Sequence, residues 1–143
     1  MTIIQRGLIG TRHVRATLAF DGSTVGDVGT DTIFAITGRV WLLGFTAFCT
    51  ESLTEGGATA TAEVGTATDI NGLIVQTIAT AIDINEWWFD ATPLPGLVQM
   101  DALQIDALLS EDIILTTGSQ TISNGTIIFD AWYIPITDNG ALA

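Results

Sequence analysis

The sequence predicts an all-β protein, an antiparallel β-sandwich or jelly roll with at most one short helix. Three observations support this class. β-Branched residues, mainly Ile and Thr, recur in short runs. Gly, Asn and Asp separate these runs. The runs follow one another at intervals of roughly ten residues, which is typical of sandwiches and barrels. The length of 143 residues suits a single domain with one core.

Six segments are predicted to be strands. They are residues 30–36, 39–50, 58–65, 87–91, 112–117 and 126–136. Thr37-Gly38 predicts a tight connection between the first two, and Asn124-Gly125 predicts a turn before the last. Residues 58–64 alternate, so we expect one face to meet the core and the other to meet solvent. The residues expected inward are Ala58, Ala60, Ala62 and Val64, and those expected outward are Thr59, Thr61 and Glu63.

Two regions are open to more than one interpretation. Residues 69–82 place apolar side chains at helical spacing, with Asp69 as a possible N-cap. The same stretch is rich in β-branched residues and contains Asn71-Gly72, which favours a strand. Residues 1–20 are a weakly basic arm or a first strand, and residues 21–143 form a single β-sandwich domain. Residues 91–96, with two prolines, are predicted to be a loop, and residues 97–109 a loop or a helical turn.

The composition points to a surface that other proteins cover. Only 14% of the residues are charged, where roughly 25% is typical, and lysine is absent. Such a surface is easily desolvated, so we expect much of it to be buried against protein. The net charge of −12 argues against nucleic acid as a partner. No apolar run approaches the ~18 residues of a membrane helix, so we expect no membrane partner either.

The basic residues lie at one end of the chain. All four precede residue 40, while the remainder of the chain carries acidic residues and no basic one. Arginine suits bidentate pairing with carboxylates on a partner protein. The candidate docking residues are Arg6, Arg12, His13 and Arg15. The alternative is that these are ordinary solvated side chains on an edge strand.

Several predicted strands are apolar on both faces, including residues 40–43, 87–89, 127–129 and 132–134. A domain of this size cannot bury both faces of all of them, so neighbouring subunits are expected to cover some. The candidate subunit-interface residues are Trp87, Trp88, Trp132 and Tyr133, with one of the two adjacent tryptophans favoured for the interface. The alternative, a central strand covered by a loop or helix, is favoured for Trp41.

The sequence offers little for catalysis. His13 is the single histidine, and no nucleophile elbow, metal-ligand spacing or phosphate-binding glycine motif is present. Cys49 ends an apolar strand and is expected to be a small buried hydrophobe rather than a nucleophile. The acidic pairs Asp83/Glu86 and Glu111/Asp112 are interpreted as solvated loops rather than a calcium site. We therefore expect no enzyme activity, no metal and no cofactor.

Two longer segments and one short one carry a resemblance to a known class. Residues 33–45, IFAITGRVWLLGF, resemble the first hairpin of small structural proteins of tailed bacteriophages. Residues 125–141, GTIIFDAWYIPITDNGA, resemble their closing strand, and Ile4-Gln5-Arg6-Gly7 is similar to their N-terminus. The middle of the chain, residues 65–109, shows no such similarity.

The resemblance implies a head-decoration (cement) protein. It implies β-sandwich or jelly-roll subunits that assemble as a homotrimer on the capsid exterior of the virion, after synthesis in the host cytoplasm. They would bind the major capsid protein without a cofactor and stabilise its lattice. Two alternatives remain: another virion part (tail tube, neck or minor head protein), and a carbohydrate-binding adhesion module in which Trp87, Trp88 and Trp132 form an aromatic platform.

Overall fold

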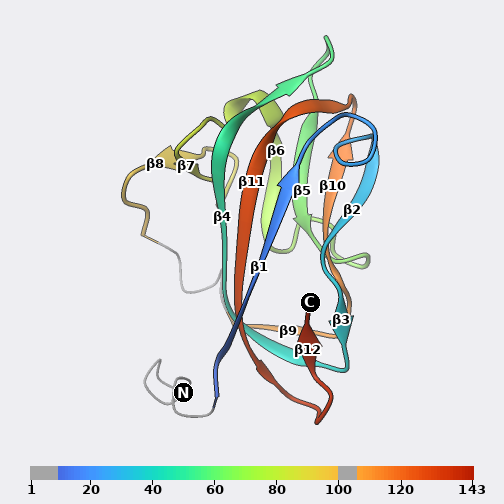
Figure 1. Ribbon diagram of the computed structural model, residues 1–143, viewed down its shortest axis with the longest axis vertical. Helices are drawn as coiled ribbons and strands as arrows, with labels where there is room; N and C mark the ends of the chain where they lie inside the picture. The colour runs from blue at the N-terminus through green and yellow to red at the C-terminus, as the bar shows by residue number, and fades with distance from the viewer. Residues whose placement is uncertain (1–9, 100–105) are drawn as a thin grey trace.

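A computed structural model describes residues 10–99 and 106–143, and it confirms the predicted all-β sandwich (Figure 1). Two antiparallel sheets pack against each other. The first sheet has the strand order β1 (Arg12–Ala19), β11 (Ile122–Pro135), β4 (Val40–Glu55), β7 (Glu86–Trp87) and β8 (Leu94–Pro95), and β9 (Ala107–Leu109) also pairs with β4. The second has the order β2 (Gly29–Phe34), β10 (Ile113–Gly118), β5 (Thr61–Gly65) and β6 (Ile74–Ile78). A small ribbon joins β3 (Ile36–Thr37) to β12 (Ala141–Leu142).

The long strands β4 and β11 form the centre of the first sheet. They pair from Ile122↔Glu55 to Pro135↔Val40. Because side chains alternate along a strand, every second residue of each faces the second sheet. The rings of Phe45 and Phe129 stack there with their centroids 5.8 Å apart. The fully buried side chains that meet them from the second sheet include Val64, Ile113 and Leu115.

The N-terminal region contributes a strand. Residues 12–19 form β1, which pairs with β11 from Arg12↔Tyr133 to Ala19↔Thr126. Val14, Ala16 and Leu18 alternate towards the core and pack against it. Residues 1–9 of the predicted arm lie outside the described residues.

The ambiguous residues 69–82 form strand β6 followed by a single 3-10 turn, η1 (Ala79–Ala81). The β-branched residues therefore prevail over the helical spacing, and β6 pairs with β5. Within the described residues, no helix is long and apolar enough to cross a bilayer.

Strand β5 follows the predicted alternation only in part. Ala60, Ala62 and Val64 are fully buried, as expected, whereas Ala58 precedes the strand and is exposed. Glu63, expected to face solvent, is buried at 8% exposure. Strand β5 is an interior strand of its sheet, so β10 lies on one side of Glu63 and β6 on the other.

The connection at Thr37-Gly38 is short, as predicted, since β3 ends at Thr37 and β4 begins at Val40. The hairpin that the resemblance implied over residues 33–45 does not form, because β2 lies in the second sheet and β4 in the first. Gly38, with φ of 62°, is the point at which the chain crosses between sheets. The turn predicted at Asn124-Gly125 is wrong. Asn124-Gly125 lies inside the continuous strand β11, where the pairing register to β4 shifts on both sides of Asn124. The dipeptide is therefore a β-bulge.

The segment after β6 contains less strand than predicted. Residues 87–91 were expected to be a strand, but β7 comprises only Glu86–Trp87. The chain turns soon afterwards, because the Asp90 carboxylate accepts a hydrogen bond of 2.7 Å from the backbone N–H of Thr92. The predicted loop over residues 91–96 holds the short strand β8, and β9 lies in the region that the sequence left open.

Candidate functional site

An ion pair joins β1 to β11 on the outer face of the first sheet. The Arg15 guanidinium donates to Asp130 through Nε at 2.9 Å and Nη2 at 3.2 Å. His13 Nε2 lies 2.6 Å from the same carboxylate, at Oδ1. The two donors are two residues apart on β1, so the strand places both on one face. Two of the predicted docking residues are thus held in place by a carboxylate of their own chain.

The environment of Asp130 lowers its pKa. Burial of the carboxyl group acts to raise the pKa, but the hydrogen bonds from Arg15 and His13 and the positive charge of Arg15 outweigh it. The pKa of Asp130 therefore lies below its ordinary value of 3.8. This ion pair stabilises the fold at every pH above that value, and the stabilisation is lost as the pH falls through the lowered pKa.

Replacement of Asp130 by Asn is expected to lower the free energy of unfolding by roughly 1 kcal/mol at pH 7, because both donors are partly exposed to water. The difference between variant and wild type should shrink as the pH is lowered below 3.8 and the wild-type carboxylate is protonated through its lowered pKa. Urea denaturation over a series of pH values measures it. Asp138→Asn, which changes an exposed carboxylate, is the control and should change stability by less than about 0.5 kcal/mol. Equal stability of Asp130→Asn and wild type at pH 7 would contradict the interpretation.

Trp132 lies beside this ion pair. It is paired with His13 across β1 and β11, and the two rings are 5.1 Å apart, between centroids. The tryptophan is 37% exposed. A predicted docking residue and a predicted interface residue therefore belong to one surface. We call this surface the outer face and define it by His13, Arg15, Asp130 and Trp132.

The other predicted docking residues are placed differently. Arg12 begins β1 and is exposed, and its position in the alternation puts it on the opposite side of the strand from His13. Arg6 lies outside the described residues.

The structure separates the two adjacent tryptophans. Trp87 is half-buried on β7; its ring lies 4.7 Å from that of Phe48, and its Nε1 donates to the carbonyl oxygen of Gly96 at 3.1 Å. Trp88 points into the core, is 1% exposed, and donates from Nε1 to Thr77 Oγ1 at 2.8 Å. The alternation along the chain turns one ring out and the other in.

The prediction of a subunit interface at Trp88 and Tyr133 requires correction. Both side chains are buried inside this chain, Tyr133 at 5% exposure, so neither presents a surface to a second copy. Trp87 and Trp132 are the two members of the predicted set that remain accessible.

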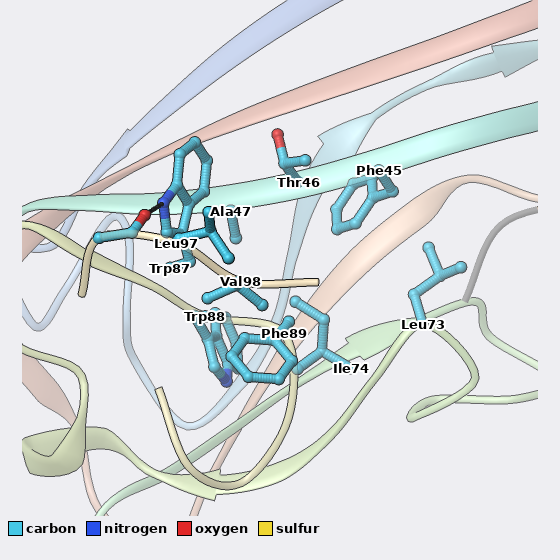
Figure 2. Close-up of a pocket in the computed structure, with 11 residues that line it drawn as sticks. Phe45, Thr46, Ala47, Leu73, Ile74, Trp87, Trp88, Phe89, Leu97 and Val98 are labelled. Atoms are coloured by element: carbon cyan, nitrogen blue, oxygen red, sulfur yellow. Dashed lines mark hydrogen bonds between the residues drawn. The ribbon is translucent and has the colours of Figure 1, made fainter. Parts of the chain in front are cut away.

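An apolar pocket opens beside Trp87 and Trp88 (Figure 2). It has a volume of about 410 Å³ and lies between β4 and β7 of the first sheet and the start of β6 in the second. Leu97 and Val98 line it from the chain after β8. None of its lining side chains is ionisable. The pocket was not predicted, because its walls come from four separate stretches of sequence.

The described residues offer little for chemistry. Cys49 is fully buried, as predicted, and its Sγ donates to the carbonyl oxygen of Glu51 at 3.0 Å. Burial raises the pKa of the Cys49 thiol to about 11, so the thiolate nucleophile is scarce at neutral pH. Among the described residues, no three His, Cys, Asp or Glu side chains lie close enough together to hold a metal ion. What the fold does present is an aromatic and charged face and an apolar pocket.

Comparison of the chain with protein-family models, with curated proteins and with solved structures finds no match.

Proposed function

We propose that the chain is a virion structural protein of a tailed bacteriophage, which decorates the exterior of the capsid and stabilises its lattice as a homotrimer. Its partners are further copies of itself and the major capsid protein. It is made in the host cytoplasm, acts on the assembled particle and requires no cofactor. A protein that binds only the expanded lattice stabilises that state by mass action.

The outer face is the observation on which the proposal depends. Trp132 stands partly exposed against His13, and the Arg15–Asp130 ion pair fixes the neighbouring polar groups. These side chains lie on β1 and β11, and β11 is paired along its length with β4, so the backbone holds the outer face in one arrangement before any partner binds. Tryptophan and arginine are the residues that most often dominate the binding energy of protein interfaces. The scarcity of charge on the rest of the chain also favours assembly over a solitary existence.

The carbohydrate-binding alternative receives less support. It requires the exposed rings of Trp87, Trp88 and Trp132 to form one platform. Trp88 is buried in the core and cannot contribute to such a platform. Another virion location, such as the tail tube or neck, shares the same composition, and the binding experiment separates it from decoration.

Replacement of Trp132 by Ala is expected to weaken binding to DNA-free expanded heads by about thirty-fold, since removal of a central tryptophan costs about 2 kcal/mol or more. Wild-type protein should bind these heads at micromolar concentration and raise their melting temperature. Co-sedimentation and calorimetry of the heads measure both effects.

Val28→Ala is the control, because Val28 is an exposed apolar residue that directly precedes β2 of the second sheet. It should bind like the wild type. Absence of wild-type binding to expanded heads would overturn the decoration role. Equal losses for Trp132→Ala and Val28→Ala would show that the outer face is not the docking surface.

A further inference from the structure

The apolar pocket has the chemistry of a site for hydrocarbon side chains. Apart from Thr46 and Gly96, the lining residues carry aliphatic or aromatic side chains (Figure 2). The indole N–H groups of both tryptophans already donate, that of Trp87 to the Gly96 carbonyl oxygen and that of Trp88 to Thr77 Oγ1. The pocket therefore offers no free indole donor to a polar ligand. Burying a polar group there without a partner is unfavourable, so aliphatic side chains are the natural occupants.

Exposed apolar residues are concentrated in the part of the sequence that supplies most of the pocket. Among the described residues, ten large hydrophobic side chains are exposed, and six of them lie between residues 70 and 97. These six are Ile70, Val75, Ile78, Ile84, Leu94 and Leu97. They lie on β6 and β8 or in the segments next to these strands. Each of the two strands is an edge strand of its sheet. Leu97 is exposed and also lines the pocket, and exposed apolar side chains beside an apolar pocket are typical of a site covered by another protein.

The charges nearby indicate what kind of segment covers it. Glu86 directly precedes Trp87 and Asp90 directly follows Phe89, two residues that line the pocket. None of the stretches that line the pocket contains a basic residue, because all of them follow Arg39, the last arginine of the chain. Residues 1–19, by contrast, carry three arginines and no acidic residue. Within that stretch, residues 2–9 read TIIQRGLI, four large aliphatic residues around Arg6.

We propose that the pocket receives residues 2–9 of a second copy of this chain. The aliphatic residues enter the pocket, and Arg6 lies among the acidic residues beside it. The contact joins two different surfaces, so it is head-to-tail and can close into a ring. The inference rests on the proposed function, which expects identical subunits to assemble, and it assigns Arg6 to the contact between copies rather than to the capsid.

Two variants of the full chain test the contact, one in the pocket and one in the docking segment, residues 2–9. Leu97→Asp places a charge at the pocket, at a side chain 82% exposed and therefore tolerant of change. The double variant I4D/L8D places two charges on the docking segment. Each should raise the dissociation constant of assembly by at least ~30-fold, because a carboxylate does not enter an apolar pocket without a large penalty. Size-exclusion chromatography with light scattering measures the mass. Leu108→Asp, at a leucine 75% exposed on β9, is the control and should assemble like the wild type.

Mixing the two variants gives the decisive result. Leu97→Asp retains an intact segment and I4D/L8D an intact pocket, so an equimolar mixture should form dimers of one copy of each. A mixture that stays monomeric overturns the head-to-tail contact, as does a monomeric wild type or a variant that assembles normally. The head-binding assay is separate. A monomer that binds heads overturns this inference and the homotrimer but leaves the decoration role standing, whereas an assembled chain that does not bind heads overturns the decoration role alone.

Discussion

Replacement of Trp88 by Ala is expected to lower the free energy of unfolding by about 3–5 kcal/mol, the usual cost of removing a large aromatic side chain from a core. Trp88 is almost completely buried, packs edge-on against Phe129 and donates to Thr77 Oγ1. Its removal opens a cavity next to the existing apolar pocket, which limits how far the core can close around it. Since domains of this size are stable by about 5–15 kcal/mol, the variant should be near its unfolding threshold at 37 °C. Urea denaturation measures the change.

Two further variants identify the cause. Trp88→Phe retains much of the apolar volume but removes the indole donor, so we expect a smaller loss of about 1–2 kcal/mol. Trp132→Ala removes a partly exposed tryptophan and should cost less than about 1 kcal/mol of stability, although it weakens binding to heads. If Trp88→Ala retained its stability but lost the ability to assemble, Trp88 would be the interface residue that the sequence suggested, and the core assignment would be wrong.

The strands that the sequence predicts best are those whose pattern is local. β4, β10 and β11 each include most of a predicted segment, because runs of β-branched and aromatic residues favour strands wherever they are placed. The sequence does not distinguish β1 from an arm, because two arginines and a histidine obscure the alternation of Val14, Ala16 and Leu18. For residues 69–82, the helical and the extended pattern are both present in the sequence. In the structure the extended form is the one that pairs, as β6, with β5. The sequence does not show this pairing.

The candidate site depends more on contacts between distant segments. The sequence pointed to His13, Arg15 and Trp132 but not to Asp130, which lies 115 residues from Arg15 along the chain. No short motif connects them. Likewise, the sequence could not decide between Trp87 and Trp88. The single pairing of Phe48 with Trp87 sets which ring faces out, and this follows only from the way β7 meets β4. The available signal was that Phe45, Ala47 and Cys49, every second residue of β4, are apolar and therefore face the core. Phe48, between two of them, then faces outward, and so does the ring of Trp87 that it contacts.

Replacement of Gly125 by Ala is expected to lower the free energy of unfolding by about 2–5 kcal/mol, from two separate causes. The first is conformational: Gly125 has φ of +119°, which L-residues adopt only with strain. The second is overlap, because a Cβ atom at this position would lie 2.8 Å from the backbone Cα of Leu53 on the neighbouring strand. Backbone cannot move aside as a flexible side chain can. Thermal and urea unfolding measure the loss.

Gly57→Ala separates the two causes. Gly57 has nearly the same φ, +123°, but a Cβ atom there would meet nothing within 4 Å. It should therefore show the conformational cost alone, about 1–2 kcal/mol. The difference between the two variants measures how tightly the bulge at Asn124-Gly125 presses β11 against β4. A hairpin turn, as the sequence suggested, would project into solvent and make the two substitutions equally costly. Equal losses would therefore contradict the bulge and restore the turn.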